Sequence, residues 1–198
     1  MTADPPARQS PLGHRAATLA ATPEAVHLRE LPFLTQLNLR VDAGGPAAGP
    51  LAEALGGSLP TAPNTAARAG DLTTLWLGPD EWLVVAPGGA PEDLEKSLRQ
   101  AIGTEPGAVV DQSAHRTTLE VTGACARDVL AKGCSLDLHP RVFGAGSCAQ
   151  TLLAQAPVLL LARGGEDTTY WLLVRSSLAS YVVDWLLDAS VEYAQGDS

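Results

Sequence analysis

The sequence predicts an α+β fold made of two duplicated half-domains, each with an antiparallel sheet and packed helices. Alternating apolar and polar residues mark short strands, most clearly at Gln36–Val41. Two longer segments, 91–102 and 177–193, instead repeat their apolar residues at helical spacing. The order strand, strand, short helix, hairpin, helix occurs twice along the 198 residues, which indicates an internal duplication.

The N-terminal residues 1–25 are rich in Ala, Pro and Thr and show little apolar periodicity. They are therefore predicted to form an extended N-terminal arm outside the core. Two interpretations of this arm stay open. It is either a disordered tail or a segment that becomes ordered against a partner.

The first α+β half is expected to span 26–104. Pro32 ends its first strand, and in its second strand Leu37, Leu39 and Val41 share one face. The segment from Pro91 to Gly103 has acidic residues early and basic residues late, as helix capping and the helix dipole favour. The expected elements are strands at 26–31 and 36–41, a helix at 50–55, a loop at 57–70, a hairpin of 73–77 with 82–86, and a helix at 91–102.

The second α+β half is expected to span 105–198 and to form one compact unit with the first. Residues 35–39 match 117–121, and the run Trp82–Val85 matches Trp171–Val174. An unrelated α+β protein would also show some symmetry of this kind, so the alternative to duplication stays open. The expected elements are strands at 109–111 and 118–121, a helix at 124–132, a hairpin of 157–162 with 169–174, and a helix at 177–193.

Composition narrows the function classes. The formal net charge is −9 and no Lys/Arg cluster occurs, so neither nucleic-acid binding nor a polybasic membrane surface is expected. The longest apolar runs are far shorter than the ~20 residues that span a bilayer. The N-terminus lacks the apolar region of a secretory signal. Three cysteines without a C-x-x-C pair favour a reducing cytoplasm over a disulfide framework.

Asp111, Ser113 and His115 are the residue types of a Ser-His-Asp catalytic triad. On a strand, however, residues two apart stand roughly 6–7 Å from each other, too far for consecutive hydrogen bonds. A G-x-S-x-G elbow is also missing from the sequence. We therefore expect Asp111 and Ser113 to brace a turn.

Three further sequence patterns are only weak signals of a metal-binding or cofactor-binding site. Cys134, Asp137 and His139 fall short of the four ligands of a structural zinc site, so Cys134 is predicted to be an ordinary buried cysteine. The lone G-x-G at 144–146 lacks the context of a dinucleotide-binding loop. The four tryptophans are predicted to pack in the core. Neither a catalytic, a cofactor-binding nor a metal-binding residue is assigned to this chain.

Several runs nevertheless resemble one family, the gamma subunit of heterotetrameric sarcosine oxidase. The similarity covers residues 10–193, and its most specific parts are W-L-G-P-D-E-W at 76–82 and D-L-H-P at 137–140. A wider resemblance, through Asp111–Ser113 and Gly123–Ala126, is to the folate-binding aminomethyltransferase domains of the glycine cleavage system. That second resemblance implies the same duplicated α+β fold, aminomethyltransferase folate-binding-domain-like.

The resemblance implies a non-catalytic structural subunit of a cytoplasmic oxidoreductase complex. Such complexes oxidatively demethylate sarcosine to glycine with hydrogen peroxide, and transfer the one-carbon unit to tetrahydrofolate. FAD, FMN, NAD, tetrahydrofolate and zinc are expected on other subunits, and the main partner is expected to be the large folate-binding alpha subunit. The alternatives are an independent folate-binding one-carbon transfer protein and, more remotely, a hydrolase that uses Ser113 and His115.

Overall fold

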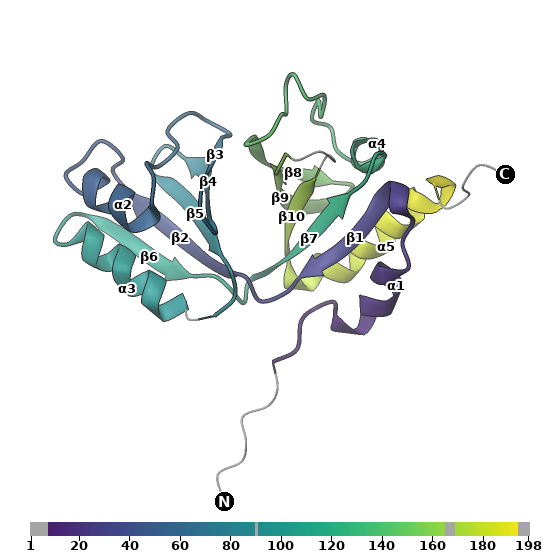
Figure 1. The fold of residues 1–198 in the computed structure, drawn as a ribbon, viewed down its shortest axis with the longest axis horizontal. Coiled ribbons are helices and arrows are strands. Elements are labelled where there is room, and N and C mark those ends of the chain that lie inside the picture. The colour runs from purple at the N-terminus through teal and green to yellow at the C-terminus, as the bar shows by residue number, and fades with distance from the viewer. Residues whose placement is uncertain (1–7, 90, 165–168, 194–198) are drawn as a thin grey trace, which may run out of the picture.

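The computed structural model describes residues 8–89, 91–164 and 169–193, and its centre is two five-stranded antiparallel sheets (Figure 1). We call them sheet A and sheet B. Sheet A has the strand order β1 (His27–Leu31), β7 (Arg116–Thr122), β10 (Tyr170–Arg175), β9 (Ala156–Ala162) and β8 (Cys148–Leu153). Sheet B has the order β3 (Ala66–Ala69), β4 (Leu72–Gly78), β5 (Glu81–Ala86), β2 (Thr35–Val41) and β6 (Gly107–Asp111).

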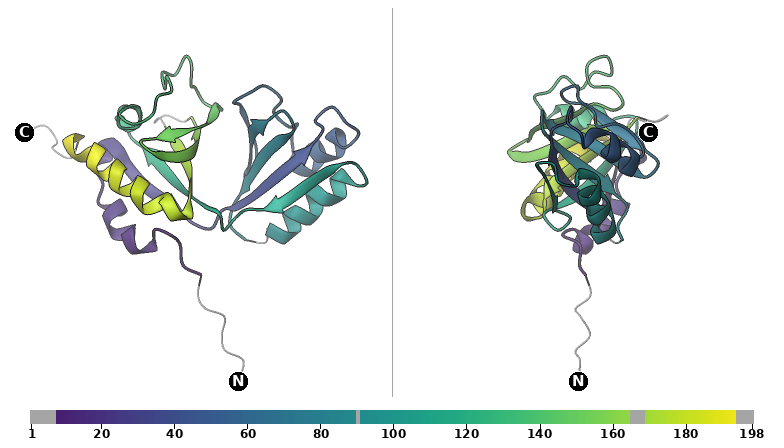
Figure 2. Two further views of the ribbon diagram at one scale, coloured as in Figure 1. Left: turned by 180° about the vertical axis from the view of Figure 1, so that it is seen from behind. Right: turned by 90° about the vertical axis from the view of Figure 1, so that its left-hand side faces the viewer.

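Helices cover the outer faces of the two sheets, which lean toward each other (Figures 1 and 2). On sheet B these are α2 (Ala48–Leu55) and α3 (Pro91–Ile102). On sheet A they are α1 (Ala16–Ala20), α4 (Ala126–Ala131) and α5 (Ala179–Ser190). Short 3-10 turns η1–η4 occur at Gly13–Arg15, Glu24–Val26, Ser176–Leu178 and Val191–Tyr193. Within the described ranges, each helix is too short or too polar to cross a bilayer.

Each half of the sequence contributes its first strand to the sheet of the other half. β1, from the expected first half 26–104, pairs with β7, whereas β6, from the expected second half 105–198, pairs with β2. The order β6-β2-β5-β4-β3 in sheet B therefore corresponds to β1-β7-β10-β9-β8 in sheet A. This correspondence confirms the duplicated α+β fold class. Each sheet therefore contains one strand from the other half of the sequence. The sequence could not predict this exchange, because the alternation of apolar and polar residues identifies a strand but not the strand it pairs with.

The pairing register corrects one predicted equivalence between the halves. Leu39 lies opposite Trp82 in sheet B, and the matching Val121 lies opposite Tyr170 in sheet A. The structural counterpart of Trp82 is thus Tyr170, not Trp171. Because side chains alternate between faces, this one-residue shift puts Trp82 and Tyr170 in the outer cores and Trp171 between the sheets.

Three expectations for single segments were wrong. The described part of the expected arm is helical at η1 and α1, and Leu12 and Leu19 from this segment are buried in the core of sheet A. The expected loop 57–70 contains β3, and β8 was not expected at all. Both missed strands lie at one edge of their sheets, and neither has a clean apolar alternation. The other expected helices and strands are confirmed to within a few residues at their ends.

A third apolar cluster lies between the sheets and joins them. It consists of buried side chains from β4, β5, β8, β9 and β10: Leu75, Leu83, Val85, Cys148, Leu159, Leu161 and Leu173. Beside it, backbone hydrogen bonds connect the start of β3 to the start of β8: the amide of Ala66 donates to the carbonyl of Gly146 at 2.7 Å, and that of Cys148 to Asn64 at 2.9 Å. The inner faces of the two sheets are therefore fixed against each other at these edge strands.

Candidate functional site

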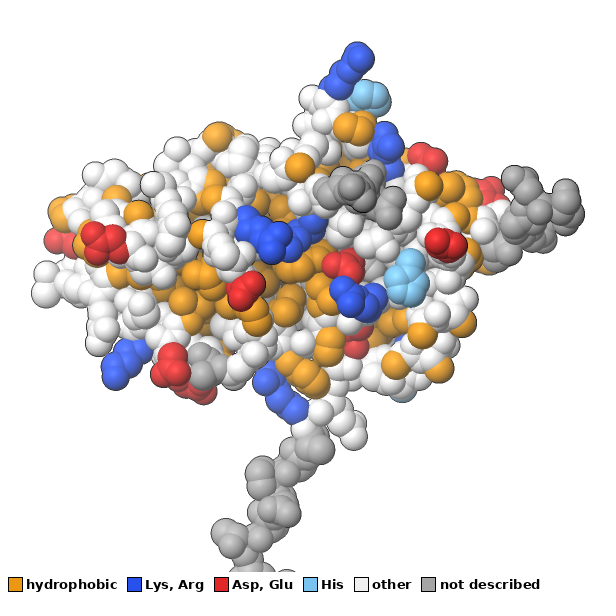
Figure 3. Space-filling view, viewed as in Figure 1, with side chains coloured by type: hydrophobic (Ala, Val, Ile, Leu, Met, Phe, Trp, Pro, Cys, Tyr) orange, Lys and Arg blue, Asp and Glu red, His pale blue; other side chains and the backbone are white. Residues whose placement is uncertain are grey.

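The inner faces of the two sheets carry an apolar cluster and two groups of polar side chains. Figure 3 shows hydrophobic side chains in the middle of one side of the molecule, between the two halves, with Lys or Arg and Asp or Glu side chains next to them. Charged residues surround the apolar cluster in two groups, one along β2 and β5 and one along β7 and β10. Both groups arise because alternate residues of these strands face the opposite sheet.

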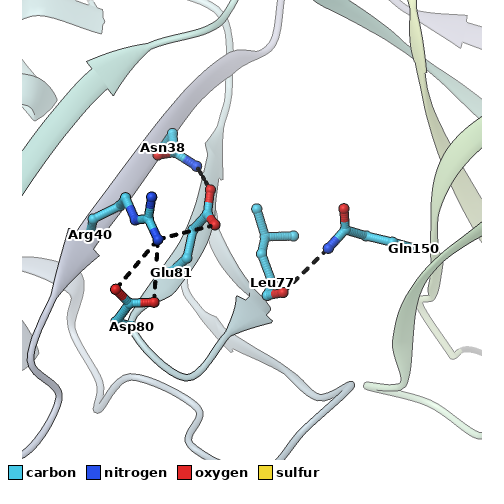
Figure 4. A network of polar contacts seen from close by, with 6 residues as sticks. All are labelled: Asn38, Arg40, Leu77, Asp80, Glu81 and Gln150. Atoms are coloured by element: carbon cyan, nitrogen blue, oxygen red, sulfur yellow. Dashed lines mark hydrogen bonds and ion pairs between the residues drawn. The ribbon is translucent and has the colours of Figure 1, made fainter.

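The first group is a network around Glu81, at the start of β5 (Figure 4). Asn38 donates to Glu81 at 2.8 Å, while Arg40 lies 3.9 Å from Glu81 and 3.4 Å from Asp80. From the other sheet, Gln150 donates through Nε2 to the carbonyl of Leu77 at 3.2 Å. These contacts hold the hairpin of β4 and β5 and tie it to β8, so they are structural.

The second group centres on Trp171. Its ring nitrogen donates to Glu120 at 3.0 Å, and Glu120 also accepts from Arg29 at 2.6 Å. The guanidinium of Arg163 stacks on the Trp171 ring, 3.9 Å from its centroid, and donates to Thr73 of sheet B at 3.0 Å. Burial is the main cause that lowers the pKa of Arg163, followed by the charge of Arg68. This group also connects the sheets, through one Arg–Thr hydrogen bond.

Asp111, Ser113 and His115 do not form a catalytic triad among the described residues. The Ser113 hydroxyl accepts from the backbone N–H of Gln36 at 3.0 Å and donates to Asp111 at 2.5 Å. Asp111 also accepts the backbone N–H of Ser113 at 2.8 Å. His115 is exposed, and its pKa is lowered by partial burial and by the charges of Arg116 and Arg175. As the sequence predicts, Asp111 and Ser113 brace the turn from β6 to β7.

The side chains of Cys134, Asp137 and His139 also contact neighbouring groups and do not converge on one site. Cys134 is buried, with its sulfur 3.8 Å from the Thr151 hydroxyl. Asp137 accepts the backbone N–H of His139 at 2.9 Å, and His139 Nδ1 accepts that of Arg141 at 3.2 Å. In the part of the chain that the structure describes, His, Cys, Asp and Glu side chains do not gather in threes as a metal site would need.

The remaining sequence candidates have structural roles as well. The G-x-G at 144–146 is the loop that bonds across to β3, and Gly146 has a φ of 83° there, a conformation that suits glycine. All four tryptophans pack against the apolar clusters, as predicted. The Trp82 ring nitrogen donates to the carbonyl of Pro60 at 2.7 Å, which satisfies its buried N–H.

Sequence reasoning missed a cavity of about 470 Å³ that β7, β8, β9 and β10 line. Leu159 and Leu173 contribute apolar surface to it, while Arg116 and Arg175 bring two positive charges. The two arginines are 59 positions apart in the chain and meet because β7 pairs with β10. Their proximity could be inferred only from the pairing register, which the strand pattern does not specify.

Comparison with known proteins shows which family this chain is similar to. The model of the sarcosine oxidase gamma subunit family matches residues 40–192. The sarcosine oxidase subunit gamma of Corynebacterium sp. (strain P-1) is 45% identical over 190 residues, covering 94% of this chain and 92% of the relative. The subunit gamma of Corynebacterium sp. (strain U-96) is 41% identical over 197 residues, covering 96% and 93%.

Solved structures give the same result. A chain of the heterotetrameric sarcosine oxidase from Corynebacterium sp. U-96 superposes with a TM-score of 0.87 at 41% identity, covering 96% of this chain and 98% of that chain. The aminomethyltransferase T of the Bartonella henselae glycine cleavage system has a TM-score of 0.63 at 15% identity. That likeness covers 89% of this chain and 49% of the transferase, and it shows the fold alone. The chain therefore belongs to the sarcosine oxidase gamma subunit family.

Proposed function

We propose that this chain is a non-catalytic structural subunit of a cytoplasmic heterotetrameric sarcosine oxidase, and that it stabilises the assembly by packing on the large alpha subunit. The observation that carries the proposal is the relationship to the gamma subunits, which extends over 94% of the chain. The whole complex would oxidise sarcosine to glycine with formation of hydrogen peroxide, and transfer the one-carbon unit to tetrahydrofolate.

The side chains that resemble catalytic groups support a structural role. The Ser113 hydroxyl and the Asp111 carboxylate are both used in the turn before β7. A zinc ion does not fit any group of described side chains, since three suitable ligands do not come together there. In the proposal, flavins, NAD, folate and zinc are bound by other subunits, and this chain supplies surface.

Co-expression of the four subunits, with and without this chain, tests the proposal. We expect the three remaining subunits to give less assembled complex on size exclusion, and less sarcosine-dependent peroxide per milligram. Addition of the purified chain should restore both quantities in proportion to the complex formed. Normal assembly and activity without the chain would refute the structural role.

A second comparison tests the absence of catalysis in this chain. Complexes that carry Ser113→Ala, His115→Asn or Cys134→Ala are compared at equal amounts of assembled tetramer. Each variant should keep the activity of the wild-type complex, because none of these side chains is expected to contact a reactant. A loss of turnover at equal assembly would place a reacting group in this chain and contradict the proposal.

A further inference from the structure

The cavity on the inner face of sheet A combines positive charge with exposed apolar surface. It is lined by Arg116 and Arg175, by the buried Leu159 and Leu173, and by Leu152, whose surface is 50% exposed. Leu152 belongs to β8, one of the two edge strands of sheet A. Arginine is enriched at the surfaces where proteins associate, and the buried centre of such a surface is more apolar than its rim.

The two arginines are direct neighbours across the β7–β10 ladder. Arg116 is half-buried and its side chain donates to that of Gln112 at 2.9 Å, whereas Arg175 is exposed and its side chain has no hydrogen-bond or ion-pair partner among the described residues. Burial lowers the pKa of Arg116, and the charge of Arg175 lowers it further. Like charges directly opposite each other on a sheet destabilise it.

Negative charge is not supplied from within the cavity. The chain has 22 acidic residues against 13 Lys and Arg, yet none of the side chains that line the cavity in the described structure is acidic. Glu81 is close enough to influence Arg116, but its carboxylate is already held by Asn38 and Arg40 (Figure 4). Within the described part of an otherwise acidic protein, two adjacent guanidinium groups thus lack a carboxylate partner.

We infer that this cavity receives an Asp or Glu side chain of a partner subunit, which Arg116 and Arg175 bind while an apolar neighbour packs on Leu152. The inference rests on the proposed function. A guanidinium pairs with a carboxylate through two parallel hydrogen bonds, which gives strength and a defined geometry. Complementary charges across an interface also speed association and fix its register.

Arg175→Gln in the four-subunit complex tests the inference. The Arg175 side chain is exposed and has no polar partner among the described residues, so its loss should not unfold the protein. We expect the variant chain to bind the other subunits about tenfold more weakly at low salt, with a flatter salt dependence. Arg175→Glu should bind more weakly still. The isolated variants should keep or slightly raise the wild-type melting temperature, since a like-charge contact is relieved.

Arg68→Gln is the matched control, because Arg68 is also exposed and, within the described ranges, its side chain donates only to the carbonyl of Gly70. It removes the same charge outside the cavity and should assemble like the wild type.

If wild-type chain assembles and Arg175→Gln assembles equally well, with the same salt dependence, the inference fails and the proposed function stands. If wild-type chain does not assemble, both fail. A shift of the isolated chain's melting temperature by free glutarate that Arg175→Gln abolishes, with unchanged assembly, would assign the cavity to a small acid instead.

Discussion

Ser113 illustrates how a serine close to an aspartate and a histidine in sequence becomes part of a turn. Its hydroxyl accepts the N–H of Gln36, a residue that is 1% exposed, and donates its own O–H to the Asp111 carboxylate. Gln36 also accepts the backbone N–H of Gln112 at 2.8 Å. These bonds extend the pairing of β2 with β6 past Asp111, at the point where the chain crosses to sheet A.

Ser113→Ala should therefore lower the free energy of unfolding by about 1–3 kcal/mol, because the buried N–H of Gln36 loses its acceptor. His115→Asn changes an exposed ring and should stay within about 0.5 kcal/mol of the wild type. Urea unfolding of both variants measures the difference. An effect of Ser113→Ala as small as that of His115→Asn would contradict the role of Ser113 as acceptor for the N–H of Gln36.

Cys148 lies fully buried between the sheets, and burial raises the pKa of its thiol from 9.0 to about 11. Between these two values the unfolded thiol loses its proton and the folded thiol keeps it, so the unfolded state binds fewer protons and stability falls as pH rises. From about pH 8.5 to about pH 10.5, the wild type should lose more unfolding free energy than Cys148→Ala. Burial also raises the pKa of Tyr170, a contribution that both proteins share and that cancels. Parallel pH profiles would contradict the expectation.

At the scale of elements, the segment before β1 differs most from its sequence-based interpretation. Ser10 donates to Glu30 of β1 at 2.7 Å, the Thr22 hydroxyl accepts the N–H of Leu28 at 3.0 Å, and Arg15 forms an ion pair with Asp184 of α5. Leu19 is 3% exposed in the core of sheet A. The segment therefore covers the outer face of sheet A, beside its edge strand β1.

Leu19→Ala should cost about 2–5 kcal/mol of unfolding free energy, the range for truncating a buried leucine. The neighbouring Thr18 is exposed, so Thr18→Ala should change stability by less than about 0.5 kcal/mol. Chemical denaturation of the two variants makes the comparison. An effect of Leu19→Ala as small as that of Thr18→Ala would restore the prediction of an arm outside the core.

The sequence predicts elements well where a single periodicity dominates, and less well where tertiary pairing decides. α3 has acidic residues in its first turn and an apolar stripe, and it spans Pro91–Ile102 as expected. β3 reads Ala-Ala-Arg-Ala, which carries no strand signal of its own, and it exists because β4 supplies its hydrogen bonds. The arginine pair of the cavity has the same origin, since it depends on the register between β7 and β10.

At the scale of the whole molecule, the exchange of β1 and β6 means that neither sheet is complete without chain from both halves. The apolar cluster between the sheets adds a second link, with Leu75 of sheet B and Leu161 of sheet A among its buried members. We expect the two halves to unfold as one cooperative unit for these two reasons. Independent halves would instead unfold separately, each with its own free energy of unfolding.

Leu98→Ala tests this cooperativity. Leu98 of α3 is buried in the outer apolar cluster of sheet B, which is separate from the outer apolar cluster of sheet A. If the molecule unfolds as a unit, the variant should speed hydrogen exchange of the slowest amides in β9 and β10 by the same factor as in β4 and β5. The destabilisation itself should be about 2–5 kcal/mol. Faster exchange confined to β4 and β5 would show that sheet B opens alone, and would mean that the exchanged strands do not couple the halves.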